Sequence, residues 1–205
     1  MNHQEEGAHA PYRTQTHARA RPAHRFAPPR RSRPVTREAT ARQAVTAEAY
    51  KAVFRRHPAG VAVVAFAHEG GHTGFTATSV ISVSADPPLL AFSIASSSSS
   101  WPALAAAPTV AVSFLADHQD DVSARFATSG IDRFAAGGWT PLPTGEPVID
   151  GAVSWLRGAV EQRTAVGSSY LVSLRVLETR TRPDGAMPLV FHDRTYHRIG
   201  TGTAI

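Results

Sequence analysis

Hydroxyl side chains gather at positions 76–84, where five of nine residues are serine or threonine. A hydroxyl group both donates and accepts hydrogen bonds, so such a cluster suits the carbonyl, hydroxyl or phosphate oxygens of a polar ligand. Gly74 and Ala77 keep the backbone uncrowded, and Pro87 and Pro88 stiffen the chain after the cluster. The segment therefore predicts a ligand-holding loop, with an ordinary turn as the alternative. The hydroxyl residues are Thr76, Thr78, Ser79, Ser82 and Ser84.

A second run of hydroxyls, at 96–100, precedes Trp101 and Pro102. Ser100 can cap a short helix, and hydroxyls beside the free N–H groups of a helix start favour a bound phosphate. A plain serine cap is the alternative, because serine is common at that position. The candidate phosphate-binding residues are Ser98, Ser99, Ser100 and Trp101.

Single side chains elsewhere could complete such a site. Arg125 and Arg133 are candidate countercharges for a phosphate, and solvated arginines are the alternative. Phe114 follows an apolar strand-like segment and could form a pocket wall, although core packing is the alternative. These residues extend the prediction of an anionic ligand.

Several classes of chemistry are excluded by what the sequence lacks. It has no cysteine, so disulfides, thiolate metal sites and cysteine nucleophiles are impossible. Its histidines show no metal-ligand spacing, and no nucleophile elbow, phosphate-binding loop or dinucleotide fingerprint occurs. No apolar stretch is long enough to span a membrane. The absence of cysteine fits a reducing compartment, and we expect a cytoplasmic protein with no membrane association.

Charge divides the 205 residues unevenly. Residues 1–43 hold nine Arg and three Glu, a net charge of +6, whereas 44–205 carry a net charge of −1. The first segment is also rich in Pro and His and poor in large apolar residues, which predicts a disordered tail ahead of one domain at 44–205. A solvated appendage or misplaced start codon, a polyanion-binding arm and a targeting sequence stay open for this tail.

The remaining pattern is mostly strand. A short amphipathic helix is expected from Thr46 to His57, and a long loop from 127 to 151, where Gly and Pro are frequent. Alternating or Val-rich runs bounded by turn residues predict strands at 60–67, 72–77, 89–94, 109–115, 152–163, 169–178 and 189–199. This pattern predicts a mostly antiparallel β-barrel with a few short helices.

The amino-acid sequence of these segments resembles that of the flavin reductase family, the FMN-binding split-barrel proteins. The likeness rests on Gly-x-Thr-Ala-x-Ser at 74–79 and Ser-Val-Ser-x-Asp-Pro-Pro at 82–88. It begins near Phe54, with Phe-Arg-Arg-His-Pro-Ala-Gly-Val, and continues in order through most of the chain. Further matching segments are 96–101, 112–115, 119–126, 132–134, 139–151 and 188–197.

The resemblance implies an antiparallel split β-barrel that forms a homodimer, with the flavin pocket at or near the subunit interface. It implies an NAD(P)H-dependent flavin reductase in which FMN or FAD takes a hydride from NADH or NADPH, with no side chain needed as acid or base. Reduced flavin would then pass to a partner monooxygenase. Flavin and nicotinamide nucleotides are thus the expected partners, and nucleic acid is not.

One departure from the family sequence weakens the prediction of reductase activity. Gly167-Ser168-Ser169 stands where family members carry Gly-Asp-His, and serine cannot hold the positive charge of an imidazolium near a flavin. A non-catalytic flavin-binding or carrier protein is therefore the alternative, and a polyanion binder acting through the Arg-rich tail is a third. The resemblance assigns to the flavin site Thr76, Ala77, Thr78, Ser79, Ser82, Val83, Ser84, Ser98, Ser99, Ser100, Trp101, Phe114, Arg125, Ser169, His192, Arg194 and Tyr196.

Overall fold

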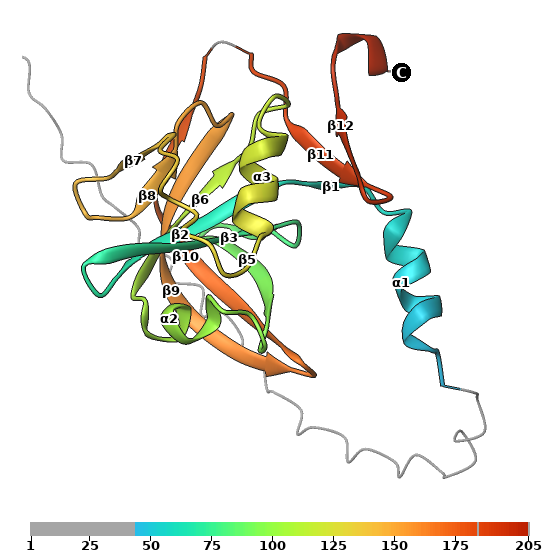
Figure 1. The fold of residues 1–205 in the computed structure, drawn as a ribbon, viewed down its shortest axis with the longest axis horizontal. Coiled ribbons are helices and arrows are strands. Elements are labelled where there is room, and N and C mark those ends of the chain that lie inside the picture. Colours follow the sequence, from blue (N-terminus) through green and yellow to red (C-terminus); the bar gives the residue numbers. More distant parts are fainter. Residues whose placement is uncertain (1–43, 184, 205) are drawn as a thin grey trace, which may run out of the picture. The chain divides into compact units, whose positions relative to one another are not determined.

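A seven-stranded antiparallel sheet forms the body of the domain (Figure 1). The computed structural model describes residues 44–183 and 185–204, so the predicted tail at 1–43 lies outside the described residues. The mostly antiparallel class is confirmed, but β3 and β4 stand at opposite edges, so the sheet is not closed into a barrel. Its order is β3 (Gly71–Ala77), β2 (Ala62–His68), β6 (Thr109–Phe114), β9 (Ser154–Val166), β10 (Ser169–Thr181), β5 (Pro88–Ala95) and β4 (Ile81–Ala85).

Strand β2 is buried on both faces, which explains its continuous apolar sequence. Ala62, Val64 and Phe66 join one hydrophobic cluster with residues of β5, β6 and β10. Val61, Val63 and Ala65 point the other way, into a second cluster with residues of α3 and β11. The sheet is therefore packed on both sides at β2.

Two smaller sheets complete the strands. β1 (Ala59–Gly60), β11 (Leu189–His192) and β12 (Thr195–Arg198) form one, and β7 (Trp139–Pro141) pairs with β8 (Pro147–Ile149) in the other. The predicted single strand at 189–199 was wrong. Asp193 and Arg194 adopt left-handed backbone conformations, with φ of 46° and 64°, and fold the segment into a hairpin. The predicted loop at 127–151 likewise contains the short β7–β8 pair.

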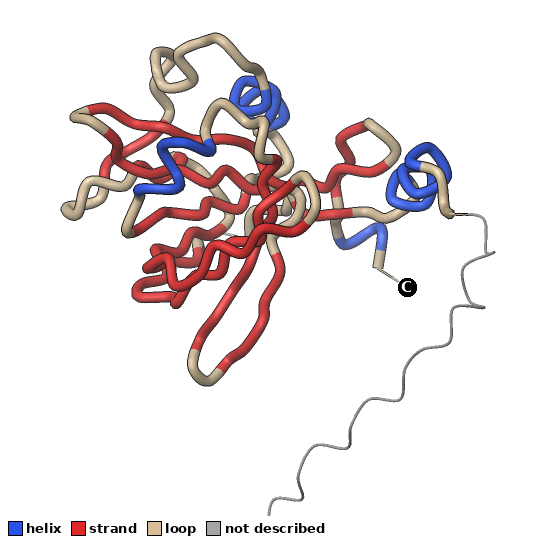
Figure 2. The backbone as a smooth tube through the Cα atoms, turned by 90° about the horizontal axis from the view of Figure 1, so that it is seen from below, coloured by secondary structure: helices blue, strands red, loops and turns tan. Residues whose placement is uncertain are grey.

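The described helices are short (Figure 2). They are α1 (Ala47–Arg55), α2 (Trp101–Ala106), α3 (Asp120–Ala127) and the 3-10 turn η2 (Thr201–Thr203). The expected helix near Thr46 is confirmed, with the Thr46 hydroxyl accepting from the Ala49 N–H at 3.2 Å. None of the helices within residues 44–183 and 185–204 has the length and apolar character needed to cross a membrane.

The hydroxyl-rich segment at 76–84 is not a loop, contrary to the sequence prediction. Its first residues end β3, residues 78–80 form a short link, and the rest belong to the edge strand β4. The β4–β5 register shifts between Ser82 and Ser84, which marks a bulge. β-Branched residues favour strands, and Ile81 and Val83 alternate with the smaller serines of this segment.

Gly74 of β3 allows a close approach of neighbouring groups. A Cβ atom there would lie 3.0 Å from the Val64 carbonyl oxygen and 3.1 Å from a ring carbon of Phe126. α3 can therefore approach the sheet closely, and Phe126 is fully buried in the second cluster. This contact fixes the position of α3 over β3.

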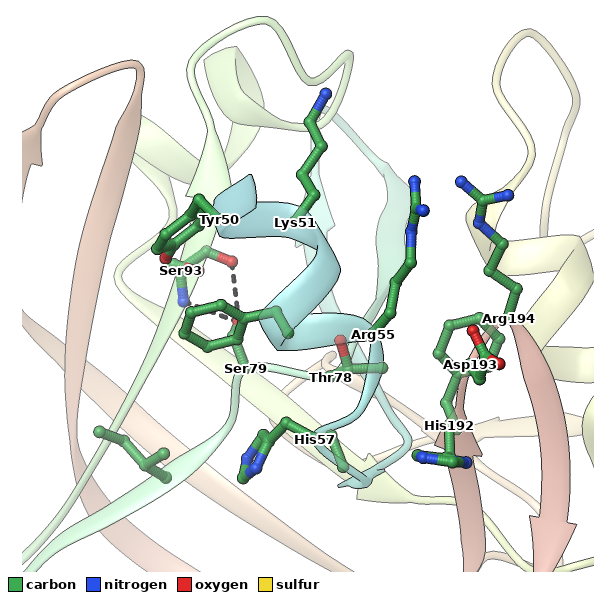
Figure 3. Close-up of a pocket in the computed structure, with 14 residues that line it drawn as sticks. Tyr50, Lys51, Arg55, His57, Thr78, Ser79, Ser93, His192, Asp193 and Arg194 are labelled. Carbon is green, nitrogen blue, oxygen red and sulfur yellow. Dashed lines mark hydrogen bonds between the residues drawn. The ribbon is translucent and has the colours of Figure 1, made fainter. Parts of the chain in front are cut away.

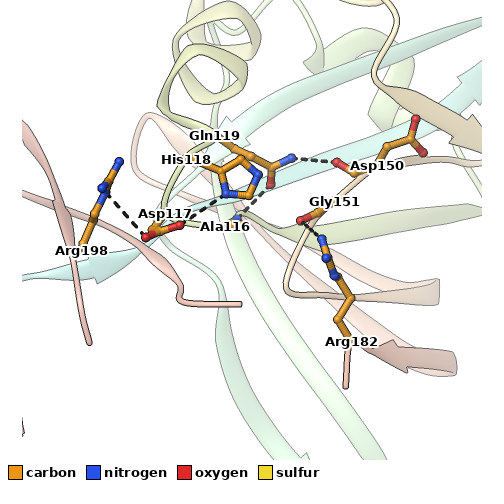
Figure 4. Close-up of polar contacts among 8 residues, drawn as sticks. All are labelled: Ala116, Asp117, His118, Gln119, Asp150, Gly151, Arg182 and Arg198. Carbon is orange, nitrogen blue, oxygen red and sulfur yellow. Dashed lines mark hydrogen bonds and ion pairs between the residues drawn. The ribbon is translucent and has the colours of Figure 1, made fainter. Parts of the chain in front are cut away.

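Polar contacts anchor the start of α3 (Figure 4). The Gln119 side chain accepts from the Ala116 N–H at 2.9 Å and donates to the Asp150 carbonyl at 2.8 Å. Nearby, Arg182 donates to the Gly151 carbonyl at 2.9 Å. Segments far apart in the sequence are thus joined where β8 ends and α3 begins.

Partly buried arginines connect elements of the domain. Arg157 on β9 pairs with Glu146 at 2.8 Å, and both side chains are largely buried. Burial by itself would raise the pKa of Glu146, but hydrogen bonds from Thr109, Thr144, its own backbone N–H and Arg157 outweigh burial and lower that pKa. Arg163 donates to the Leu104 and Ala107 carbonyls at the end of α2, and burial lowers its pKa.

Candidate functional site

A cavity of about 690 Å³ opens between α1, the β3–β4 link and the β11–β12 turn (Figure 3). Its volume lies within the range of small-molecule sites, roughly 300–1,000 Å³. The residues that line it are Tyr50, Lys51, Phe54, Arg55, His57, Ala59, Thr78, Ser79, Ile81, Ser93, Phe191, His192, Asp193 and Arg194.

Helix α1 forms an aromatic wall of this cavity. Tyr50 and Phe54 lie one helical turn apart, and their ring centroids are 4.7 Å apart. The helix buries none of its residues, and Phe54 is 55% exposed. An amphipathic helix whose apolar side faces a cavity leaves flat aromatic surface available to a ligand.

A smaller hollow of about 170 Å³ shares Thr78 and Phe191 with the main cavity. Its hydroxyls form a network around Ser123 of α3. The Thr76 hydroxyl donates to the Ser123 carbonyl at 2.6 Å, and the Tyr196 hydroxyl donates to Ser123 Oγ at 2.9 Å. Because Thr76 and Tyr196 use their hydrogens within the protein, they offer a ligand only acceptor oxygens.

The link between β3 and β4 presents two different hydroxyls. Ser79 Oγ donates to the Ser93 carbonyl at 3.1 Å and accepts from the Ser93 N–H at 3.0 Å, which leaves it one free lone pair. Thr78 has no hydrogen-bond partner among the described residues, and it lines both hollows. Thr78 can therefore donate to a ligand, whereas Ser79 can only accept.

Six of the residues predicted for the site come together here. They reach it from β3, the link, β11, the β11–β12 turn and β12, so the fold joins an early and a late part of the domain sequence. These residues are Thr76, Thr78, Ser79, His192, Arg194 and Tyr196.

The serine run before α2 is placed differently. Ser100 is 1% exposed, donates weakly to the Gly74 carbonyl at 3.5 Å and accepts from Arg133 at 3.0 Å. Trp101 stacks on Tyr170 with ring centroids 3.6 Å apart. Ser98 accepts from the Ser100 N–H at 3.3 Å, and neither it nor Ser99 is among the residues lining the two hollows.

Arg125 and Arg133, the predicted phosphate countercharges, bind protein carbonyls instead. Arg133 donates to the carbonyls of Gly74 at 2.6 Å and Thr128 at 2.8 Å, and burial lowers its pKa. Arg125 donates to the Gly137 carbonyl at 3.2 Å, and its guanidinium carbon lies 5.6 Å from the centre of the Phe126 ring. Arg125 Nε has no hydrogen-bond partner among the described residues.

Other predicted residues also lie outside the lining of the two hollows. Ala77 and Phe114 pack in or against the first hydrophobic cluster. Ser169 begins β10, where it pairs with Ala95 of β5. Ser82, Val83 and Ser84 lie on the edge strand β4, and Val83 is 55% exposed.

Sequence reasoning missed the contribution of α1 to the site, and that of Phe191 on β11. Tyr50, Phe54 and Phe191 are aromatic residues whose spacing fits ordinary core packing, and Arg55 fits the end of any helix. The available signal was that the family resemblance starts at Phe54, within the helix. Ser93 was hidden in an apolar strand pattern, where its side chain faces the cavity.

Comparison with known proteins decides the family. The sequence profile of the flavin reductase like domain matches residues 54–200. The chain belongs to the flavin reductase family. An NADH:FMN oxidoreductase of Rhodococcus erythropolis is 45% identical over 153 residues, which cover 73% of this chain and 80% of that protein.

Solved structures of the family share the fold. A nitrilotriacetate monooxygenase component B homologue from Mycobacterium thermoresistibile superposes with a TM-score of 0.73 at 30% identity, covering 77% of this chain and 89% of that one. An NADH:FAD oxidoreductase from Streptomyces globisporus C-1027, solved with NAD and FAD fragments, gives 0.73 at 27% identity, covering 80% and 100%. The flavin reductase fold is thus shared well beyond close sequence relatives.

Proposed function

We propose that this member of the flavin reductase family reduces FMN or FAD with NADH or NADPH in the cavity beside α1. The observation that carries the proposal is a cavity of about 690 Å³ that combines aromatic walls, hydroxyls and cations. A flavin nucleotide presents a flat ring, a hydroxylated chain and a phosphate, and each finds matching groups there. Relatives named as NADH:FMN oxidoreductases support the same activity.

The side chains fit the parts of a flavin. Tyr50, Phe54 and Phe191 offer apolar surface for a ring system. Ser79 can accept a hydrogen bond and Thr78 can also donate one, as the N–H and carbonyl edge of the ring requires. Arg55 and Arg194 supply positive charge at the rim.

The contribution of the protein is then binding and orientation. When bound, a flavin accepts a hydride from the nicotinamide ring and carries the electrons onward. The α1 aromatics orient the ring face and exclude water from one side, and the hydroxyls fix its edge. None of these roles needs a side chain that gains or loses a proton, which agrees with a site lacking the family histidine at Ser169.

A homodimer is part of the proposal, as is a partner monooxygenase. Apolar side chains stand exposed at the cavity mouth, with Tyr50 at 59% and Ile81 at 56%, and Val53 on α1 at 69%. Strand β4 is a sheet edge with unpaired backbone groups. A second copy of the chain that packs on α1 and β4 would cover both elements and close the cavity. Sedimentation equilibrium measures the mass of the assembly, and the mass of a single chain would contradict the homodimer.

A cytoplasmic location stays a prediction from the sequence.

The activity is tested with purified protein and two measurements. Quenching of flavin fluorescence measures binding of FMN and FAD, and the loss of NADH or NADPH absorbance measures turnover. We expect flavin-dependent oxidation of the nicotinamide. Flavin binding without turnover would instead favour the non-catalytic carrier, and the absence of both would refute a flavin function.

A matched pair of variants locates the site. Thr78→Leu places a bulkier apolar side chain in the cavity without breaking a hydrogen bond within the described residues, and we expect roughly tenfold weaker FMN binding. Thr179→Leu makes the same change at an exposed position of β10 outside the cavity lining. Equal FMN affinity in the two variants would show that flavin does not bind in this cavity.

A further inference from the structure

Two arginines stand together at the rim of the cavity. Arg55 lies in the last turn of α1, and Arg194 lies in the turn between β11 and β12. The Asp193 N–H donates to the Arg55 carbonyl at 3.0 Å, so the hairpin turn is tied to the end of the helix. Figure 3 shows both side chains extending in the same direction from this junction.

Neither guanidinium has an ion-pair or hydrogen-bond partner within residues 44–183 and 185–204. The third cation of the lining, Lys51, already pairs with Glu48 at 3.1 Å. Asp193 also lines the cavity, but its carboxylate forms no ion pair with either arginine in the described residues. Both guanidinium groups line the same cavity, so an anion bound there would compensate two positive charges.

The backbone at Arg194 supports a role for its side chain. Asp193 and Arg194 have φ of 46° and 64°, the pattern of a two-residue hairpin turn that favours Asn-Gly. A left-handed conformation is unfavourable for a residue other than glycine. Strain kept at the rim of a cavity, where glycine would remove it, points to a use for the guanidinium there.

We propose that Arg55 and Arg194 together bind a phosphate group of the nucleotide that occupies this cavity. The inference rests on the proposed function for the identity of that nucleotide. Arginine presents forked N–H donors that match phosphate oxygens, and charge-assisted hydrogen bonds of this kind are the strong ones. The serine run at 96–100, which the sequence predicts for this role, has its Ser100 hydroxyl occupied by Gly74 and Arg133.

The test compares ligands that differ by a phosphate. FMN and riboflavin share the ring and the ribityl chain, so their affinity ratio isolates the phosphate. In the double variant Arg55→Gln/Arg194→Gln we expect FMN affinity to fall at least about tenfold and riboflavin affinity to stay unchanged. Raising the salt concentration should weaken FMN binding to the wild type more than to the variant.

The matched control is Arg56→Gln. Arg56 is the next residue of the same helix end, but it does not line the cavity, so it tests a general loss of positive charge. Arg194→Gly provides a second variant in case the double variant folds poorly, because glycine readily adopts the left-handed turn. We expect this glycine variant to fold and to lose FMN affinity selectively.

Further arms identify the source of the phosphate. If the variant instead raises the KM for NADH with riboflavin as acceptor, and leaves the ratio of FMN to riboflavin affinity unchanged, the arginines bind the nicotinamide dinucleotide. If FMN, riboflavin and NADH all behave as in the wild type, the proposal is wrong while the reductase activity stands. If the wild type binds no flavin, calorimetry with ADP decides: binding lost in the double variant supports the phosphate site, and no binding overturns it.

Discussion

The arginines of the sheet body and those of the cavity rim have opposite surroundings. Arg133, Arg157 and Arg163 each make two hydrogen bonds or more, or a buried ion pair, with groups of the protein. Arg55 and Arg194 have no such partner in the described residues, although they line a cavity. Removing a charge from water is unfavourable unless other groups compensate it. Protein groups compensate Arg133, Arg157 and Arg163, so we assign these three a structural role.

This contrast separates stability from binding by a rule that can be checked. When the N–H groups of a guanidinium already donate to carbonyls or to a carboxylate of the protein, the same N–H groups are not free to bind a ligand. A guanidinium with open donors beside a cavity has that capacity at little expense to the fold. Substitutions in the first group should therefore lower stability, and those in the second should lower affinity for a phosphate.

The largest effect on stability is expected for Arg157→Met. It leaves the Glu146 carboxylate buried, with 2% of the side chain exposed, and without its cation. Breaking a buried pair in this way costs about 3–5 kcal/mol. Urea unfolding measures the change, and FMN affinity of the remaining folded protein should match the wild type.

A double variant provides the control for that result. Arg157→Met combined with Glu146→Gln removes both charges, so no ion is left uncompensated in the core. We expect it to be more stable than Arg157→Met alone. A single variant as stable as the wild type would show that the pair adds nothing and would weaken the division into two groups.

The sequence predicted the body of the fold better than its rim. The Val-rich run of β2 and the capped helix at Thr46 carry strong local signals, because burial on two faces and helix capping each leave a recognisable pattern. The turn at 69–71 was also visible: Glu69 and Gly70 have φ of 49° and 78°. In contrast, Asp193-Arg194 lacks the glycine that usually marks a two-residue turn, so the β11–β12 hairpin was not predicted.

The candidate site was predictable where it resembles the family and not where it depends on distant contacts. Thr78 and Ser79 stand in a recognisable motif and line the cavity. Ser100 stands in one too, but its hydroxyl is occupied by Arg133, which comes from a segment remote in sequence. Which polar groups are already satisfied depends on tertiary packing, and no local pattern encodes it.

A smaller loss of stability is expected for Arg133→Gln. The change removes the donor to the buried Ser100 Oγ and the shorter of the two side-chain hydrogen bonds to the Gly74 carbonyl, and an unsatisfied buried group costs about 1–3 kcal/mol. Thermal and urea unfolding measure it. FMN and riboflavin affinities should both be unchanged, whereas a selective loss of FMN affinity would place Arg133 with the rim arginines.

The smallest effect on stability is expected from acidification, and it depends on Glu146, the partner of Arg157. The pKa of Glu146 is lowered in the folded protein, because hydrogen bonds to its carboxylate outweigh the cost of burial. A carboxyl group with a lowered pKa stabilises the fold at pH values above its unfolded pKa, and that contribution is lost as the pH falls through the folded pKa. Glu146→Gln cannot titrate, so the difference in unfolding free energy between wild type and variant should shrink as the solution is acidified. A difference that stays constant from neutral to acid pH would mean that Glu146 does not cause the pH dependence of stability.

The rim variant Arg55→Gln/Arg194→Gln keeps Glu146, so the pH dependence of its stability should follow that of the wild type.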